Sequence, residues 1–505
     1  REYTFQPGIY RRPLSTIDSA GNSRKSYDLQ GRLETETDKR NHVTRYAYDA
    51  SGYVSAVTQA EDTPEQRRIE MDRAAATHLL TEHRIRDAAG VLKAKTAWTY
   101  NARNQVASVT VTDPADNATR SIATTYCEAP DVSAANGACP ILGLVKTIDG
   151  PRPGTLDVTT YQYRPADEAG CAASPETCAY RKGDLWKVVN ASDHVTEILA
   201  YDGAGRLKSA KDVNGVITDF EYSPRGWLTA RKVRGTNDAS EADDRISRIE
   251  YLDHGLVHKI IQPDGVFVQF SYDGAHRLIK VVDGDGNAID YTLSGAGNRV
   301  KEEISDANNT LRRTLESAYN TLGQLRDIRD HRAQTVADAP ATISYLYDPE
   351  GNLNTATDAR GRKAENQYDP LGRLKRTLEN ATAAVDAPDR TETGFEYDAL
   401  DRLTKVVDPN GLPTSYRYNG FGEQTRLESR NTGITNFEYD GAGNRAKQID
   451  ANSKTTDYTY DGLNRITAMQ YLQEPSLNVS YAYDVAQSDC TAGETFLVGR
   501  LSRMT

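Results

Sequence analysis

Short segments that alternate between apolar and polar residues recur along the chain. In Phe220–Tyr222, Phe395–Tyr397 and Tyr416–Tyr418 a charged residue stands between two aromatic residues. Because successive residues of a strand point to opposite faces of a sheet, each segment predicts a β-strand with an aromatic face and a polar face. A polar second face is typical of a single sheet layer. No segment has the 3.6-residue period of an amphipathic helix of useful length.

Most of these strands lead into the sequence Tyr-Asp-x-x-Gly, which predicts a tight turn. An Asp side chain can accept a hydrogen bond from the backbone two residues further on, and Gly accepts a positive φ. We assign to such turns Tyr27, Asp28, Gly31, Tyr48, Asp49, Gly52, Tyr201, Asp202, Gly205, Tyr272, Asp273, Tyr347, Asp348, Gly351, Tyr368, Asp369, Gly372, Tyr397, Asp398, Tyr439, Asp440, Gly443, Tyr460 and Asp461. About half a repeat later a second turn signal follows, as at Asp212–Gly215, Asp283–Gly286, Asp358–Gly361 and Asp408–Gly411.

The turn signal has a regular period. Tyr397, Tyr418, Tyr439 and Tyr460 are each 21 residues apart. Two turns and two short strands in one period predict one β-hairpin per repeat. A β-propeller fits less well, because its blades need about 40–45 residues.

The sequence therefore predicts an all-β fold, a coiled antiparallel ribbon of hairpins. We expect residues 1–505 to form a single continuous array, with irregular inserts near 126–143, 163–183 and 484–499. The repeats run up to both ends, which predicts a fragment of a larger protein.

Composition narrows the classes of partner. Hydrophobic residues make up 38% of the chain, too few for a core that is thick on both sides of a sheet. The 29 tyrosines suit a sheet face that is only partly shielded from water, since each has an apolar ring and a polar tip. The net charge is −11 and both signs are scattered, which argues against nucleic acid and an anionic membrane as partners. No apolar run is long enough for a membrane span.

Several side chains could be mistaken for a reactive site. The turn aspartates recur with the repeat, whereas a catalytic pair is unique, so we predict no catalytic residue. His254 and His258 have a zinc spacing only if they lie on a helix, and Asp283–Asn287 resembles a calcium loop that lacks its distal Glu. We therefore predict neither a metal nor a cofactor.

Arginines follow the turns, and we expect them to pair with the turn aspartates, each exposed pair contributing up to about 1 kcal/mol. They are Arg32, Arg206, Arg277, Arg373, Arg402 and Arg465.

The five cysteines lie in the irregular inserts. Cys127 with Cys139 and Cys171 with Cys178 could form two local disulfides, which would leave Cys490 unpaired, and free thiols are the alternative. No C-x-x-C pattern indicates a zinc site.

The Y-D-x-x-G-[RN]-L units resemble the YD repeats of Rhs proteins, and similar repeats occur in Tc insecticidal toxin C components and in teneurins. The resemblance covers nearly the whole chain. It implies a hollow β-shell, which in bacterial members typically encloses a C-terminal toxin domain. The chain departs from the family pattern, because the D-P-x-G-L type core that usually closes the shell is missing, and Asp369–Gly372 belongs to an ordinary repeat. No self-cleavage residue can be carried over.

Two functions follow as hypotheses. The first is a non-catalytic shell segment of an exported bacterial protein, secreted or at the cell surface, whose cargo is its own C-terminal toxin or effector domain. The second is a cell-surface adhesion or carbohydrate-binding protein, whose aromatic ladder would stack on sugars. Secretion-system components and surface carbohydrate are the further candidate partners.

Overall fold

The computed structural model describes residues 2–5, 12–133, 139–236, 240–332, 341–385, 387, 389–485 and 496–505. These residues form 40 β-strands, and the only helical elements among them are α1 (Ala129–Ser133) and the 3-10 turn η1 (Pro475–Leu477). The prediction of an all-β fold is confirmed. Within the same ranges, no helix is both long and apolar enough to cross a membrane. Cys490 and part of the insert near 484–499 lie outside the described residues.

The chain divides into two compact units, and each contains segments that are far apart in sequence. Unit 1 consists of Arg1–Thr96, Thr112–Ala118 and Gln269–Gly433, and unit 2 of Ala97–Val111, Thr119–Val268 and Ile434–Thr505. The single array over 1–505 stays a prediction.

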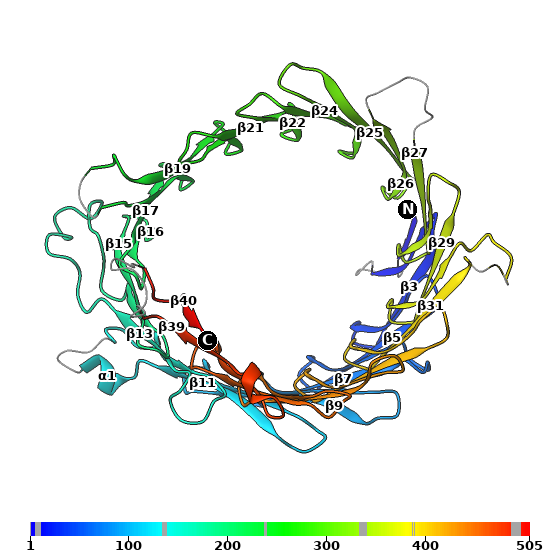
Figure 1. Cartoon of the computed structure of the whole chain (residues 1–505), viewed down its shortest axis with the longest axis horizontal. Coiled ribbons are helices and arrows are strands. Elements are labelled where there is room, and N and C mark those ends of the chain that lie inside the picture. Colours follow the sequence, from blue (N-terminus) through cyan, green and yellow to red (C-terminus); the bar gives the residue numbers. More distant parts are fainter. Residues whose placement is uncertain are drawn as a thin grey trace. The chain divides into compact units, whose positions relative to one another are not determined.

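The strands of unit 1 occur in two runs (Figure 1). They are β1 (Glu2–Phe5), β2 (Pro13–Asp18), β3 (Gly21–Tyr27), β4 (Leu33–Thr37), β5 (Val43–Tyr48), β6 (Val54–Gln59), β7 (Arg67–Arg73), β8 (Leu80–Arg86), β22 (Leu278–Asp283), β23 (Ala288–Leu293), β24 (Arg299–Ser305), β25 (Leu311–Tyr319), β26 (Leu325–Arg332), β27 (Ala341–Tyr347), β28 (Leu353–Thr357), β29 (Lys363–Tyr368), β30 (Leu374–Glu379), β31 (Thr391–Tyr397), β32 (Leu403–Val407), β33 (Pro413–Tyr418) and β34 (Gln424–Ser429).

Unit 2 likewise has two runs of strands. They are β11 (Thr119–Tyr126), β12 (Val145–Asp149), β13 (Thr159–Tyr163), β14 (Leu185–Val189), β15 (Val195–Tyr201), β16 (Leu207–Lys211), β17 (Ile217–Tyr222), β18 (Leu228–Val233), β19 (Arg245–Tyr251), β20 (Val257–Ile261), β36 (Arg445–Ile449), β37 (Thr455–Tyr460), β38 (Ile466–Tyr471), β39 (Val479–Tyr483) and β40 (Leu501–Met504). Residues of both units contribute to β9 (Leu92–Tyr100), β10 (Val106–Thr112), β21 (Phe267–Tyr272) and β35 (Gly433–Tyr439).

Within each run, every strand pairs antiparallel with the next, so that one repeat is one hairpin. In the hairpin of β17 and β18, Thr218 lies opposite Val233 and Phe220 opposite Arg231. The register shifts just before Tyr222, which lies opposite Leu228. The same shift precedes the YD-turn tyrosine in other repeats, including those of Tyr48, Tyr368 and Tyr460. The shift therefore belongs to the repeat and marks the start of each YD turn.

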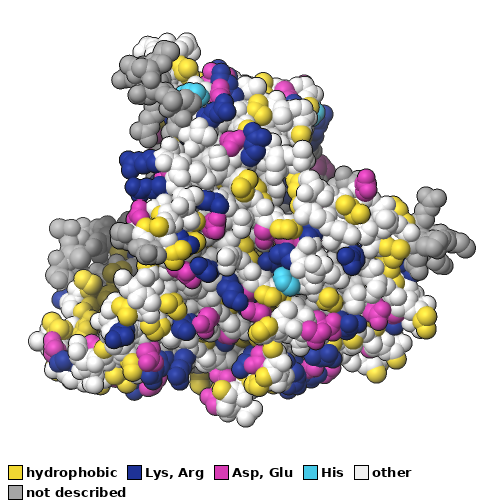
Figure 2. Space-filling model, turned by 90° about the vertical axis from the view of Figure 1, so that its right-hand side faces the viewer, with side chains coloured by type: hydrophobic (Ala, Val, Ile, Leu, Met, Phe, Trp, Pro, Cys, Tyr) yellow, Lys and Arg dark blue, Asp and Glu magenta, His cyan; other side chains and the backbone are white. Residues whose placement is uncertain are grey.

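The sheet has little fully buried core. Phe220 and Tyr222 are half-buried, while Glu221 between them is exposed. A small cluster of buried residues, Cys127, Cys139 and Tyr163, lies under the first insert. The face seen in Figure 2 mixes cationic, anionic and hydrophobic side chains. A thin sheet is what a chain with 38% hydrophobic residues can build.

Each unit has an early run of strands, which comes first in the sequence, and a late run, which comes near the end of its residues. Inside each unit, turns of the early run contact turns of the late run. In unit 1, β3 and β5 lie beside β29 and β31 (Figure 1), and Arg67 Nη1 is 2.5 Å from Asp401 Oδ2, 334 residues away. In unit 2, Asn214 and Val498 are hydrogen-bonded across 284 residues. Side-chain contacts between turns therefore hold the two runs of each unit together.

Candidate functional site

The YD turn is the structural unit that recurs most often, and Asp202 shows how it is built. Its Oδ1 accepts the backbone N–H groups of Ala204 and Arg206, both at 2.9 Å, and its Oδ2 accepts Arg206 Nε at 2.6 Å. Gly205 has a φ of +79°, a conformation that a residue with a Cβ adopts at a cost. One carboxylate thus organises the whole turn.

Every predicted turn aspartate accepts the backbone N–H four residues further on. These residues are Asp28, Asp49, Asp202, Asp273, Asp348, Asp369, Asp398, Asp440 and Asp461. Positive φ values are found at Gly31, Gly52, Gly205, Gly351, Gly372 and Gly443. Where Gly is missing, His276, Asp401 and Asn464 take this conformation, and these residue types tolerate it best.

In most of the YD turns the tyrosine joins its hairpin to the preceding one. The ladder between β16 and β17 ends at Ser209 and Asp219. Two residues beyond Ser209, the Tyr222 hydroxyl donates to the carbonyl of Leu207 at 2.9 Å. The tyrosine side chain therefore continues the hydrogen bonding between the two hairpins beyond the point where the backbone hydrogen bonds end.

The same bond recurs along both units. Tyr27 donates to the carbonyl of Pro13, Tyr48 to Leu33, Tyr201 to Leu185, Tyr347 to Leu325, Tyr368 to Leu353, Tyr418 to Leu403, Tyr460 to Arg445 and Tyr483 to Ile466, at 2.7–3.0 Å. Tyr272, Tyr397 and Tyr439 end strands in the same way.

The turn arginine links the carboxylate of its own turn to the tyrosine of the next. Arg206 pairs with Asp202, and its guanidinium lies 4.6 Å from the ring centre of Tyr222. Equivalent stacks place Arg32 over Tyr48, Arg373 over Tyr397, Arg402 over Tyr418 and Arg465 over Tyr483. We call the arrangement of turn carboxylate, arginine and following tyrosine the YD joint.

The expected pairing with the turn aspartate is present for each of the six predicted turn arginines. The pairs are Arg32–Asp28, Arg206–Asp202, Arg277–Asp273, Arg373–Asp369, Arg402–Asp398 and Arg465–Asp461.

The YD joint alters the titration of its groups. For Asp202, desolvation acts to raise the pKa, but hydrogen bonds from the Arg206 backbone and side chain outweigh it and hold the pKa below its ordinary value. The Arg277 side chain is the main cause of the lowered pKa of Asp273. Burial raises the pKa of Tyr201 and of Tyr418. At neutral pH Asp202 and Asp273 are therefore anionic, and Tyr201 and Tyr418 are neutral donors.

The residues that resembled metal ligands, Asp283, His254 and His258, belong to turns and a strand of the repeat. Asp283 Oδ1 accepts the N–H groups of Asp285 and Asn287, and its Oδ2 accepts the Asn287 side chain at 2.8 Å. Its carboxylate is thus engaged by a hairpin turn. His258 lies on strand β20 and His254 in the turn before it, so the helical spacing does not apply.

Two inserts carry cysteine pairs. The structure has S–S bonds between Cys127 and Cys139, 2.02 Å long, and between Cys171 and Cys178. Each insert rests on a YD turn. Arg103 of the turn before the first insert pairs with Glu128, and Arg181 of the second insert donates to the carbonyl of Gly203 at 3.3 Å.

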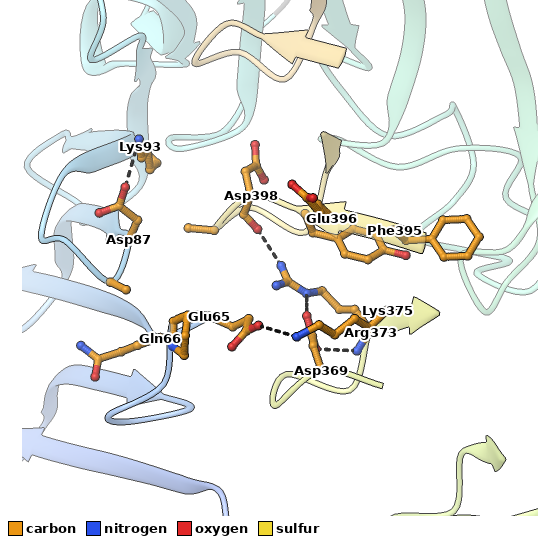
Figure 3. A pocket seen from close by; sticks show the side chains of 14 residues that line it. Glu65, Gln66, Asp87, Lys93, Asp369, Arg373, Lys375, Phe395, Glu396 and Asp398 are labelled. Carbon is orange, nitrogen blue, oxygen red and sulfur yellow. Dashed lines mark hydrogen bonds and ion pairs between the residues drawn. The ribbon is translucent and has the colours of Figure 1, made fainter. Parts of the chain in front are cut away.

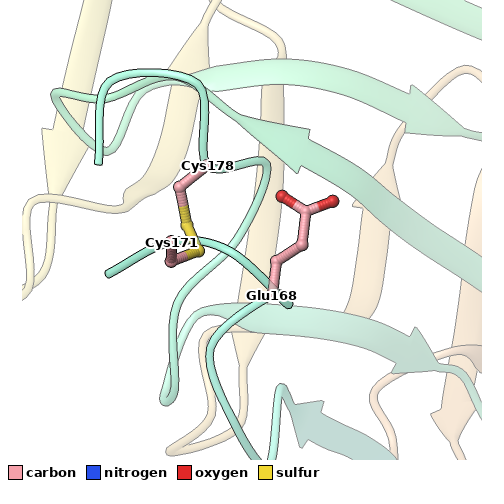
Figure 4. A group of neighbouring side chains, drawn as sticks. All are labelled: Glu168, Cys171 and Cys178. Carbon is pink, nitrogen blue, oxygen red and sulfur yellow. A yellow bond between two sulfur atoms is a disulfide. The ribbon is translucent and has the colours of Figure 1, made fainter. Parts of the chain in front are cut away.

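One group in the second insert has the residue types of a metal site. Ligand atoms of Glu168, Cys171 and Cys178 lie within 4.8 Å of one another (Figure 4). The sulfurs are bonded to each other, and Glu168 Oε2 accepts the N–H of Ala179 at 2.6 Å. In this state the group stabilises the insert and has no thiolates to offer a metal.

A cavity of about 520 Å³ in unit 1 lies between its early and late runs (Figure 3). Phe395 and Tyr397 of β31 line it together with charged side chains. The cations there have carboxylate partners, since Lys93 pairs with Asp87, Lys375 with Glu65 and Arg373 with Asp369. The cavity thus combines two aromatic rings with paired cations, and Glu396 and Asp398 give its lining an excess of acids.

Comparisons with known families agree with this repeat. The teneurin YD-shell model matches residues 294–487, and the RHS-repeat model matches residues 201–237 and 251–288. The chain belongs to the Rhs/YD-repeat family. No curated protein sequence matches it.

Solved structures show how far the likeness of this YD-repeat protein extends. A Tc holotoxin pore of Photorhabdus luminescens, with a mutated TccC3 component, is 14% identical at a TM-score of 0.53, over 92% of this chain and 27% of that chain. The TcdB2–TccC3–TEV crystal structure is 12% identical at a TM-score of 0.48, over 92% of this chain and 22% of that one. At such identities the likeness concerns the fold. The chain spans about a quarter of the length of these relatives.

Sequence reasoning missed two parts of the YD joint. It did not predict that the tyrosine hydroxyl donates to a carbonyl of the previous hairpin, or that the arginine lies over the next tyrosine. A signal was present, because Arg and Leu follow several of the turns, as in Arg206–Leu207 and Arg402–Leu403.

Proposed function

We propose that the chain is a non-catalytic wall segment of a shell that encloses a toxin or effector domain of the same polypeptide. The observation that carries this proposal is the YD joint. Because each joint links one hairpin to the one before it, an array of such units grows as a continuous wall and needs no separate core.

Contacts between the runs of each unit support the proposal. In unit 1 Arg40 lies 3.8 Å from Asp348, and in unit 2 Arg152 Nη2 donates to Asn464 Oδ1 at 2.7 Å. Such contacts would join neighbouring runs of strands within a wall. The family membership and the fold-level likeness to the Tc holotoxin structure point the same way.

The mechanism is confinement. Strands that are paired on both sides leave few free edges, so such a wall resists pairing with other chains. A wall that excludes large molecules keeps an enclosed domain away from its targets until release. The two cysteine bridges suit an oxidising compartment, as expected for an exported bacterial protein.

The test is an electron-microscopy reconstruction of the parent polypeptide, with and without the residues that follow Thr505. We expect a hollow particle whose internal density disappears on truncation. An open or solid rod, unchanged by truncation, would refute encapsulation. Proteolysis gives an independent measure, since an enclosed domain should be cut only after the wall is unfolded.

The second candidate is carbohydrate binding, which the unit 1 cavity favours through its aromatic lining. Stacking of a sugar on Phe395 should appear as binding on a glycan array that is lost in Phe395→Ala and kept in Phe267→Ala, in another strand. Absence of any glycan signal would remove this candidate and leave the shell proposal unaffected.

A further inference from the structure

A second cavity, of about 640 Å³, lies within unit 2. Strands β17, β18 and β19 and the turn Asp212–Gly215 form one side, and residues 496–500 form the other. Four of its lining residues are arginines, Arg231, Arg234, Arg245 and Arg500, whereas Asp212 is the only acid among the described residues of its lining. This cationic cavity stands out in a protein of net charge −11.

The sheet register places two of these arginines on one face. Arg231 lies opposite Ser247, and Val233, two residues further along β18, lies opposite Arg245. Residues two apart on a strand share a face, so Arg231 and Arg245 are diagonal neighbours, about 7–8 Å apart at their backbones. Like charges at this spacing repel, and an anion between them would remove the repulsion.

The arginines differ in their partners. Arg234 is paired with Asp219, whose Oδ2 lies 2.6 Å from Arg234 Nε. Arg231, Arg245 and Arg500 are exposed and have no carboxylate partner within the described part of the chain. This contrasts with the YD joints and with the unit 1 cavity, where the cations are neutralised. Three arginines without a carboxylate partner among the described residues therefore line one concave surface.

The remaining lining suits an oxyanion. Thr218 and Ser247 offer hydroxyl donors and Gln262 an amide. Oδ1 of Asp212 accepts the N–H groups of Asn214 and Val216, which ties this carboxylate to its own turn. Guanidinium groups bind phosphate and sulfate by paired, charge-assisted hydrogen bonds.

We propose that this cavity binds a ligand with two or more phosphate or sulfate groups. Two or more groups are required because the arginines are spread over β18, β19 and the segment 496–500. The proposal is independent of encapsulation, since it concerns only unit 2.

Binding would also act on the fold of unit 2. Residues 496–500 contact the turn through Asn214, whose amide bonds both the N–H and the carbonyl of Val498. A ligand that contacts Arg500 and Arg245 together would bridge this segment to the sheet. Because a ligand of the folded state stabilises it, the amide of Val498 should exchange more slowly in its presence.

The test is isothermal titration calorimetry of the full chain with pyrophosphate and, separately, with a disulfated disaccharide. The matched variants are Arg245→Gln and Arg248→Gln, which remove the same charge from opposite faces of β19. We expect saturable binding that weakens at least about tenfold in Arg245→Gln, the loss of one charge-assisted contact, and is unchanged in Arg248→Gln. Arg231→Gln should behave like Arg245→Gln.

The two ligands distinguish the sources of the oxyanion. Tighter binding of pyrophosphate would assign the site to phosphate compounds, and tighter binding of the disaccharide to sulfated glycans. Absence of saturable binding for both, or equal losses in Arg245→Gln and Arg248→Gln, would overturn the proposal. Near-identical melting temperatures for the variants are the required control for folding.

Discussion

Arg206 lies with its guanidinium 4.6 Å from the ring centre of Tyr222, in the next hairpin, while its Nε donates to Asp202 in its own turn. One side chain thus couples two repeats. In repeat proteins stability is approximately a sum of units and nearest-neighbour interfaces. The YD joint is such an interface term, and the predictions about it concern neighbouring hairpins.

Loss of the Tyr222 hydroxyl should weaken this interface. In Tyr222→Phe the carbonyl of Leu207 loses its donor while the ring remains under Arg206, and we expect a cost of about 1 kcal/mol. Tyr222→Ala should cost more, because the stacked ring is lost too. Denaturant unfolding of the full chain measures both. Glu221→Ala, on the exposed side of the same strand, is the control, and an equal effect there would show that the two faces are misassigned.

The positive φ of Gly205 predicts a second effect. The space around a Cβ at this position is open, so Gly205→Ala should be destabilised by backbone strain alone, by about 1 kcal/mol. Gly274→Ala is the matched control, because that site is equally open and no positive φ is found there. A smaller loss of melting temperature for Gly205→Ala than for Gly274→Ala would contradict the turn geometry.

Asn214 should control the docking of the segment 496–500. Replacement by Ala removes both hydrogen bonds to Val498. We expect the amide of Val498 to exchange faster with solvent, while the melting temperature of the chain changes little. Asn410→Ala alters the same turn position in another repeat and should leave Val498 exchange unchanged. Hydrogen exchange with mass spectrometry reads out both variants.

Reduction should affect unit 2 selectively, because both cysteine bridges lie in it. Peptide mapping without reductant should recover Cys127 linked to Cys139 and Cys171 linked to Cys178. Each bridge closes a short loop and should contribute about 2–3 kcal/mol. With dithiothreitol, strands β13 and β14 should lose exchange protection and strands of unit 1 should not. Alkylation of these four cysteines without prior reduction would contradict the bridges.

The lowered pKa of Asp202 predicts how its contribution varies with pH. A carboxyl whose folded pKa lies below its unfolded pKa stabilises the protein above the unfolded value and loses that effect as pH falls through the folded one. Asp202→Asn should therefore lower the melting temperature at pH 7, and the difference from the parent chain should shrink as pH falls below the ordinary Asp value of about 4 and vanish below the folded pKa. A melting-temperature difference that does not change with pH would contradict the role of the Asp202 charge.

The hairpin, its period and the chemistry of its turns could be predicted from the sequence alone. These features are local, since Asp202 bonds atoms two and four residues away and a strand alternates its faces whatever it packs against. For that reason the positions of Asp202 and Gly205 could be assigned without coordinates. The arginine pairing of the turn followed from the same spacing.

Which repeats contact each other could be learned only from the three-dimensional structure. Asn214 and Val498 are 284 residues apart, and Arg67 and Asp401 are 334 apart, with nothing in the repeat to distinguish them from other turns. Such contacts depend on the twist accumulated over many strands, and small changes of twist at each strand alter which turns come together. The cationic cavity of Arg231, Arg245 and Arg500 arises in this way, because two of its arginines share a sheet face and the third arrives with a distant segment.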